Sequence, residues 1–177
     1  MVDNKEKELV NSFLNGNESS FNEIIKNYQK NIYWHARRMV GNHFDADEIT
    51  QEVIIVIYKK LKNFRFQSTL KTWIYKITFS KTLNFLRKQK LKKIFNFSEM
   101  PNQSFRNNED IIEKFEQKEK IENIQNKLKG LPNKQREVFI LRHFEELSYE
   151  EISQITGKSI GGLKANYFHA IKKILGK

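Results

Sequence analysis

A group of hydrogen-bond donors lies close to the C-terminus, between residues 159 and 174. Lys164, Asn166 and His169 would project from the first turns of a helix, and Lys172 and Lys173 follow one turn later. Side chains of this kind bond to the base edges displayed in the major groove of DNA, and lysines also pair with phosphates. The segment therefore predicts a surface that reads duplex DNA, although a solvated basic helix would show the same spacing.

Two helices joined by a tight turn would position these donors. Ser148 and Glu151 form a capping pattern that predicts the start of the first helix, and Gly157 permits the left-handed turn that ends it. Ser159 can cap the second helix, while Lys158 occupies a turn position where an apolar side chain is usual. Apolar residues would close the two helices on each other, namely Ile152, Ile155, Ile160 and Leu163. This pattern is typical of a helix-turn-helix.

The bulk composition restricts the classes of partner. The 177 residues include 32 lysines and arginines against 21 aspartates and glutamates, a formal net charge of +11, which attracts nucleic acid or an anionic membrane surface. The chain has no cysteine, which excludes disulfides and thiolate metal sites, and its four histidines are scattered. We therefore expect no metal and no other cofactor. No stretch resembles a signal sequence or a membrane span, which predicts a cytoplasmic protein without membrane insertion.

The periodicity of apolar residues predicts an all-α protein made of two small helical domains joined by a linker. Apolar side chains recur at intervals of three and four, and only 2 prolines and 7 glycines interrupt the chain. Residues 1–93 form the first domain, residues 94–124 a linker that contains a helix, and residues 125–177 the second domain. The periodicity is lost over residues 94–108, which is typical of a linker. Capping patterns predict helix starts at Ser20, Asp45 and Ser68, with Gly41 ending the helix that Ser20 opens.

The C-terminal segment LPNKQREVFILRHFEELSYEEISQITGKSIGGLKANYFHAIKKI resembles region four of bacterial sigma factors over its whole length. In that family, region four binds the minus-thirty-five promoter element and the flap of the polymerase beta subunit. His169 stands where many members carry arginine. The resemblance and the donor pattern together imply a set of minus-thirty-five contacts: Ser159, Lys164, Ala165, Asn166, Tyr167, Phe168, His169, Lys172 and Lys173.

The segment DADEITQEVIIVIYKKLKNF resembles the part of region two that binds the clamp helices of the polymerase beta-prime subunit. The resemblance implies that Glu48, Gln51 and Glu52 carry this contact. Their spacing places them on one face of a helix, opposite an apolar stripe. An acidic face on a basic protein is suited to a basic partner, although a solvated helix face would look the same. The stripe consists of Ile49, Val53 and Ile57.

The adjoining segment NFRFQSTLKTWIYKI resembles the part of region two that captures an opened DNA strand. This task requires aromatic faces, because stacking on an aromatic ring stabilises an unpaired base by about 1–3 kcal/mol, and cations for the phosphates. Trp73 also has the helical spacing of a core residue. Ser80 replaces an asparagine that is common in the family, and Asn84 replaces a frequent aspartate. The implied minus-ten contacts are Asn63, Phe64, Arg65, Phe66, Ser68, Lys71, Trp73, Tyr75, Lys76, Ser80 and Lys81.

Both resemblances, in this order and separated by a linker, are typical of extracytoplasmic-function (group four) sigma factors. The family implies a non-catalytic subunit that binds core RNA polymerase and promoter DNA, with an anti-sigma factor as a further partner. One alternative is a two-domain helix-turn-helix regulator that acts without polymerase. Another is a nucleic-acid-processing enzyme that holds a metal through Asp45, Asp47 and Glu48, although these residues also suit a helix N-terminus.

Overall fold

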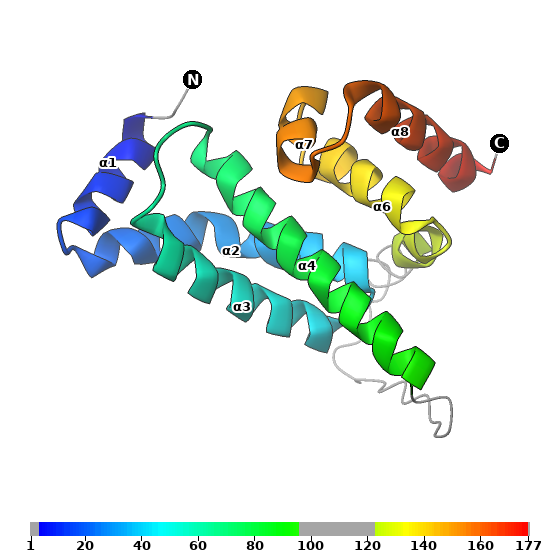
Figure 1. Cartoon of the computed structure of the whole chain (residues 1–177), viewed down its shortest axis with the longest axis horizontal. Helices are drawn as coiled ribbons and strands as arrows, with labels where there is room; N and C mark the ends of the chain where they lie inside the picture. Colours follow the sequence, from blue (N-terminus) through cyan, green and yellow to red (C-terminus); the bar gives the residue numbers. More distant parts are fainter. Residues whose placement is uncertain (1–3, 96–122, 177) are drawn as a thin grey trace, which may run out of the picture.

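Apolar residues at helical spacing form the interior of this protein, and no strand occurs within residues 4–95 and 123–176, the ranges that the computed structural model describes (Figure 1). The all-α class expected from the sequence is thus confirmed. Among the described helices, none is both long and apolar enough to cross a membrane. Most of the linker, and with it most of the helix expected there, lies outside the described residues.

The N-terminal unit contains four helices: α1 (Asn4–Leu14), α2 (Glu18–Val40), α3 (His43–Leu61) and α4 (Leu70–Phe95). Helix α2 packs against α1 and α3, and α4 packs against α2 and α3 (Figure 1). The apolar stripe expected on α3 is buried at the centre of this unit, together with residues of the neighbouring helices. The central side chains are Ile24, Ile32, Ile49, Val53, Ile57 and Ile74.

Two helices of this unit begin at asparagines rather than at the expected residues. Asn17 caps α2 by accepting a hydrogen bond from the Ser19 amide, and Ser20 is buried inside the first turn. Asn42 likewise caps α3 and accepts from the Asp45 amide at 2.9 Å. In both cases the expected cap was wrong because an asparagine three residues earlier in the chain, with extended backbone, already accepts a hydrogen bond from a free amide of the first turn.

The expected cap at Ser68 was also wrong, by one residue. The Thr69 hydroxyl accepts a hydrogen bond from the Thr72 amide at 3.1 Å, whereas the Ser68 hydroxyl donates to the Thr69 carbonyl. The expected stop at Gly41 is confirmed, because this glycine has a φ of 88° and its amide bonds to the Arg37 carbonyl.

The C-terminal unit begins with a helix over residues 123–129 and continues with α6 (Asn133–Phe139), the π-helix η1 (Ile140–Phe144), α7 (Tyr149–Thr156) and α8 (Ile160–Leu175). The capping box of Ser148 and Glu151 is confirmed, with both reciprocal hydrogen bonds present. Gly157 ends α7 with a φ of 71°, and Ser159 caps α8. Helices α7 and α8 therefore form the expected helix-turn-helix.

The two units pack directly against each other. Helix α4 lies between the other N-terminal helices and α7, and α2 contacts η1 (Figure 1). Tyr75 and Phe79 of α4 join an apolar cluster with Val138 and Leu141 of the C-terminal unit. Met39 of α2 joins a second cluster with C-terminal residues, among them Leu128, Phe139 and Ile140. Both clusters are buried, so the described structure is a closed arrangement of the two units.

Candidate polymerase and nucleic-acid interfaces

An aromatic hollow of about 420 Å³ lies where the segment between α3 and α4 meets the start of α4. The buried ring of Phe64 lies 4.9 Å from the ring of Phe66 and 5.2 Å from that of Trp73. Trp73 is half-buried, so it packs against the core and also lines the hollow. The lining residues are Asn63, Phe64, Arg65, Gln67, Ser68, Thr72, Trp73, Lys76 and Gln154. Aromatic, amide, hydroxyl and cationic groups thus meet in one concave site, a combination that suits an unpaired base.

The backbone next to this hollow is strained at Phe66. Its φ of 56° falls in the left-handed region, which costs a residue with a bulky side chain about 1–3 kcal/mol. The Lys7 ammonium lies 5.9 Å from the Phe66 ring centroid, and the centroid of the Phe64 ring lies 4.9 Å from it. Strain of this kind is concentrated at functional loops, which agrees with a role for this segment in binding.

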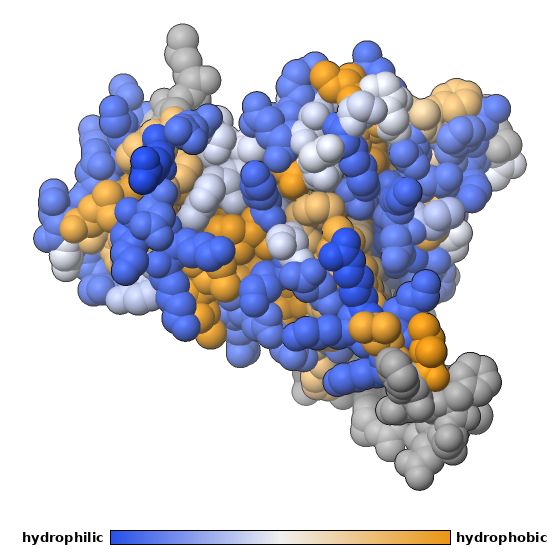
Figure 2. Space-filling model, in the orientation of Figure 1, coloured by the Kyte–Doolittle hydropathy of each residue, from blue (hydrophilic) through white to orange (hydrophobic). Residues whose placement is uncertain are grey.

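Most of the residues expected to contact an opened strand do lie together. Six of them line the aromatic hollow, as given above, and Ser80 and Lys81 line a neighbouring hollow of about 630 Å³ beside α3. Figure 2 shows an apolar area over α3 next to α4, where Val56 and Ile77 also line this second hollow. The ring of Phe66 is tilted by 57° against that of Phe64, and Phe66 lines neither hollow.

Lys71 and Tyr75 lie elsewhere. The Tyr75 side chain is 1% exposed in the boundary between the two units, where its ring completes an apolar cluster, and Lys71 donates to the Glu145 carbonyl at 3.1 Å. The Tyr75 ring therefore does not lie at the surface, where we expected it as an aromatic face for an unpaired base. Gln67, Thr72 and Gln154 were not among the expected residues, and Gln154 comes from α7, which no local sequence signal could connect to this hollow.

The acidic face of α3 forms as expected, with Glu48, Gln51 and Glu52 all exposed. Glu52 also pairs with Lys81 of α4 at 2.9 Å, which joins this face to the second hollow. Two large apolar side chains lie exposed on the same helix and were not expected: Phe44, which is 65% exposed, and Ile55, which is 52% exposed. Exposed apolar groups beside carboxylates are suited to a protein partner.

Helix α8 presents most of its expected donors to solvent. Lys164, Ala165, Phe168, His169, Lys172 and Lys173 are exposed, and Ser159 lies exposed at the cap. Asn166 is half-buried and its amide donates to the Gly162 carbonyl at 2.7 Å. Tyr167 was expected to project outward, but its ring stacks on Phe139 at 5.9 Å and meets the edge of Tyr149. It packs inward because this position continues the apolar stripe of Leu163 and Ala170.

The unusual lysine of the turn has a structural partner. The Lys158 ammonium donates to a carboxylate oxygen of Glu137 at 2.6 Å, and the Glu137 side chain is only 3% exposed. Burial raises the pKa of the Glu137 carboxyl, while the hydrogen bond from Lys158 acts in the opposite direction. Lys158 therefore compensates a buried carboxylate of α6, which explains a cation at a position that is usually apolar.

The carboxylates at the start of α3 are each engaged in the local structure. Asp45 accepts hydrogen bonds from the side chains of Asn42 and Gln89, and Asp47 pairs with His43 at 3.1 Å. Glu48 belongs to the separate exposed face. Within the described residues, no group of three or more histidines and carboxylates could hold a metal ion. This geometry gives no support to a metal-dependent nuclease.

Comparison with known proteins matches each of the two units to a family model. Residues 24–92 match the model of Sigma-70 region 2, and residues 121–174 match that of Sigma-70, region 4. The chain is 30% identical to the RNA polymerase sigma factor SigV of Bacillus subtilis over 148 residues, which cover 84% of each chain. It is 27% identical to the ECF RNA polymerase sigma factor SigW of the same organism over 165 residues, or 89% and 88% of the two chains.

Two solved structures share the fold. One is the sigma factor RpoE in complex with the anti-sigma factor NepR from Bartonella quintana, with a TM-score of 0.73, 19% identity and coverage of 88% of this chain and 94% of that one. The other is CnrH in complex with the cytosolic domain of CnrY, with a TM-score of 0.73, 17% identity and coverage of 97% and 96%.

A helix-turn-helix of region four that follows a region-two bundle defines the class of transcription initiation factors. This chain belongs to the sigma-70 family of RNA polymerase sigma factors, in the extracytoplasmic-function group. It is a polymerase-binding protein that recognises promoters, and the alternative of a regulator acting without polymerase is not favoured.

Proposed function

We propose that this sigma factor holds a promoter at two points while the exposed face of α3 binds core RNA polymerase. We assign polymerase and minus-ten binding to residues 1–93, the connection to residues 94–124, and minus-thirty-five binding to residues 125–177. The observation that carries the proposal is the aromatic hollow, where rings, amides and cations meet. Polymerase performs the chemistry in the cytoplasm, and this chain supplies specificity and traps the opened strand.

The aromatic hollow supports the minus-ten assignment through its size and lining. Its volume of about 420 Å³ admits a planar base, and the indole of Trp73 and the ring of Phe64 provide apolar walls. Arg65 and Lys76 lie on the same lining and can neutralise the phosphates on either side of the base. Stacking then returns about 1–3 kcal/mol for each base, which offsets the cost of a few kcal/mol for unpairing it.

The exposed face of α3 supports the polymerase assignment through its charge. Glu48, Gln51 and Glu52 present two carboxylates and an amide on a protein whose net charge is +11. Such a face is complementary to a basic partner such as the beta-prime clamp helices. Phe44 and Ile55 extend it with exposed apolar surface. We also propose that the C-terminal unit contacts the beta flap.

An anti-sigma factor is a further proposed partner. The sigma factor RpoE and the protein CnrH share this fold, and each was solved with a second protein, the anti-sigma factor NepR and the cytosolic domain of CnrY. The exposed apolar side chains of α3 offer a surface that such a partner could cover.

The proposed function is tested by mixing the protein with core polymerase and a supercoiled template library and then mapping transcript starts. We expect new start sites that share two sequence elements at a constant spacing.

Replacement of Gln51→Ala together with Glu52→Ala should weaken core binding roughly tenfold, about 1.4 kcal/mol, because both side chains face the partner. Core affinity is measured by titration against labelled polymerase.

A matched control for this variant is available on α1. Glu8→Ala with Asn11→Ala also removes one carboxylate and one amide from an exposed helix face, and it should leave core affinity within twofold of wild type. If both double variants bound core alike, the assignment of the α3 face would be wrong. If the wild-type protein neither bound core nor created start sites, the proposed function itself would be wrong.

A second prediction concerns the recognition helix. Lys164→Ala should reduce the discrimination between the preferred upstream element and altered sequences by about 1–3 kcal/mol, because Lys164 is exposed on the first turns of α8. Fluorescence titrations with a panel of duplexes measure this difference. Lys173→Ala, on the last turn, should instead weaken all duplexes equally. A uniform loss for Lys164→Ala would show that this residue contacts phosphate rather than bases.

A further inference from the structure

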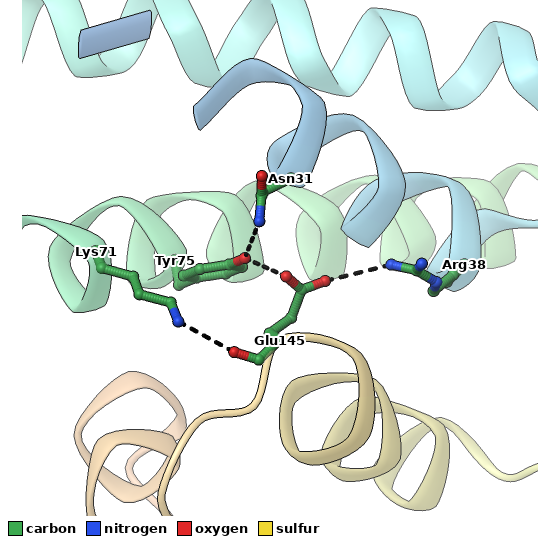
Figure 3. A network of polar contacts seen from close by, with 5 residues as sticks. All are labelled: Asn31, Arg38, Lys71, Tyr75 and Glu145. Carbon is green, nitrogen blue, oxygen red and sulfur yellow. Dashed lines mark hydrogen bonds and ion pairs between the residues drawn. The ribbon is translucent and has the colours of Figure 1, made fainter. Parts of the chain in front are cut away.

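A buried polar network joins the two units at Glu145, the residue that directly follows η1 (Figure 3). One carboxylate oxygen accepts a hydrogen bond from Tyr75 of α4, and the other accepts from Arg38 of α2 at 3.4 Å. Lys71 donates to the Glu145 carbonyl at 3.1 Å, and Asn31 donates to the Tyr75 hydroxyl at 3.5 Å. The Glu145 side chain is 2% exposed, so its carboxylate is largely shielded from water.

All the donors of this network belong to the N-terminal unit, and Glu145, which accepts from three of them, comes from the C-terminal unit. Arg38 and Asn31 are seven residues apart on α2, and Lys71 and Tyr75 are four apart on α4, so each pair lies on one helix face. In the absence of Glu145, these four side chains would present two cations, a phenol and an amide (Figure 3). Such a donor set is suited to an anion, and it binds a phosphate as well as a carboxylate.

The closed arrangement also conflicts with strand capture. Lys71 and Tyr75 belong to the segment of α4 that the proposed function assigns to the minus-ten element, and both are occupied by Glu145. Gln154 of α7 lines the aromatic hollow itself. The C-terminal unit therefore lies against the surface where an opened strand would have to lie.

We propose that Arg38, Lys71 and Tyr75 form a binding site for a phosphate of promoter DNA, and that Glu145 fills this site in the free protein as an internal substitute. The proposal rests on the promoter contact assigned above to the N-terminal unit. DNA and Glu145 then compete for the same donors, so the closed arrangement is autoinhibited. Release of Glu145 frees the phosphate site and moves α7 away from the aromatic hollow in one step.

The energetics of the network allow such an exchange. Burial raises the pKa of the Glu145 carboxyl, even though the Tyr75 hydrogen bond and the charge of Arg38 act in the opposite direction. The ionised carboxylate is thus held at a net desolvation cost within the interface. A DNA phosphate binds the same donors at the surface with a smaller desolvation cost, and the neighbouring phosphates of the strand add further contacts with the protein. Apolar contacts of Met39 and Phe79 keep the units closed until then.

The decisive experiment compares Glu145→Gln with Glu146→Gln in binding to a promoter fork labelled with a fluorophore. Both variants remove one negative charge, but Glu146 is exposed and lies outside the network. We expect Glu145→Gln to bind the fork at least fivefold more tightly than wild type and Glu146→Gln to change by less than twofold. Arg38→Gln and Lys71→Gln should bind more weakly than Glu145→Gln, because they open the protein but also lose a donor to the phosphate, and Lys71→Gln should reduce the salt slope by about one. Equal affinities for the two glutamate variants would overturn the proposal.

A second readout follows closure itself. Because the chain has no cysteine, a dye pair can be placed by Glu8→Cys and Glu150→Cys, both exposed, on α1 and α7. Energy transfer should fall for Glu145→Gln, Arg38→Gln and Lys71→Gln alike, and on addition of fork DNA to the wild-type protein. Inorganic phosphate at the same phosphate concentration should leave the transfer unchanged, because it brings only one contact.

The outcomes separate the parts of the proposal. A gain of DNA affinity in Arg38→Gln or Lys71→Gln as large as that in Glu145→Gln would show that the network only joins the units and is no phosphate site. Opening by inorganic phosphate alone would assign the site to the free anion and overturn its assignment to DNA. Normal start sites combined with unchanged energy transfer in Glu145→Gln would overturn the autoinhibition and leave the proposed function intact.

Discussion

Replacement of Arg136 by methionine should lower the free energy of unfolding by about 2–4 kcal/mol, because four carbonyls, three of them partly buried, would lose their donor. The Arg136 guanidinium donates to the carbonyls of Leu128, Lys129 and Leu131 at 2.7 to 3.1 Å within the C-terminal unit. It also donates to the Met39 carbonyl at 2.9 Å, where α2 approaches its end. Methionine preserves the apolar stem and restores none of these bonds.

This effect can be measured by urea denaturation followed by circular dichroism. Arg142→Met is the matched control, because the Arg142 guanidinium donates to one carbonyl, that of Leu147, and should cost about 1 kcal/mol. Arg136→Lys should also destabilise strongly, since one ammonium cannot reach carbonyls on several sides. If Arg136→Met and Arg142→Met lost the same stability, the carbonyl contacts of Arg136 would not be the source of its effect.

Local signals in the sequence predicted the C-terminal unit well. Ser148 and Glu151 satisfy each other's amides within one turn, and Gly157 needs only its own backbone to end α7, so both could be read from adjacent residues. The caps at Asn17 and Asn42 were missed for a related reason. Each helix start offers two polar residues that could act as the N-cap, and which of them does so depends on backbone geometry that the sequence pattern does not contain.

Features that depend on distant partners could not be predicted in this way. Lys158 looked anomalous in its turn until the structure placed Glu137 beside it, 21 positions earlier in the chain. The burial of Tyr75 depends on Glu145, 70 positions later. An aromatic residue at helical spacing is equally compatible with a core, a DNA surface or an interface between units. The sequence therefore predicted the aromatic hollow, but not the closed arrangement that covers one side of it.

The stability of this protein should also fall at mildly acidic pH because of His35. Its side chain is 0% exposed, neither ring nitrogen has a hydrogen-bond partner among the described residues, and its ring lies 6.0 Å from that of Tyr75. Burial, assisted by the charge of Arg38, lowers the pKa of His35 to about 3, whereas an unperturbed histidine has a pKa of 6.5. The folded state therefore excludes a proton that the unfolded state binds below pH 6.5.

The sign of the effect follows from this difference. The stabilisation is complete above the unfolded pKa of 6.5 and is lost as the pH falls toward the folded pKa of about 3. At 1.36 kcal/mol for each pH unit, the loss amounts to about 3 kcal/mol by pH 4. The raised pKa values of Glu137 and Glu145 act in the opposite direction over part of this range, so the informative quantity is the difference between two proteins.

Replacement of His35 by leucine isolates that quantity. Near pH 8 the variant should be about as stable as wild type, because it replaces a neutral ring with unsatisfied nitrogens by an apolar side chain of similar size at the same buried position. Below pH 6.5 the variant should become progressively more stable than wild type, with a gap of about 3 kcal/mol at pH 4. His169→Leu, on the exposed face of α8, should follow wild type at every pH. Parallel stability curves for His35→Leu and wild type would mean that the His35 ring gains water or a partner on acidification. Burial would then not be the cause of the acid sensitivity, and the boundary beneath Tyr75 would be more open than the closed structure shows.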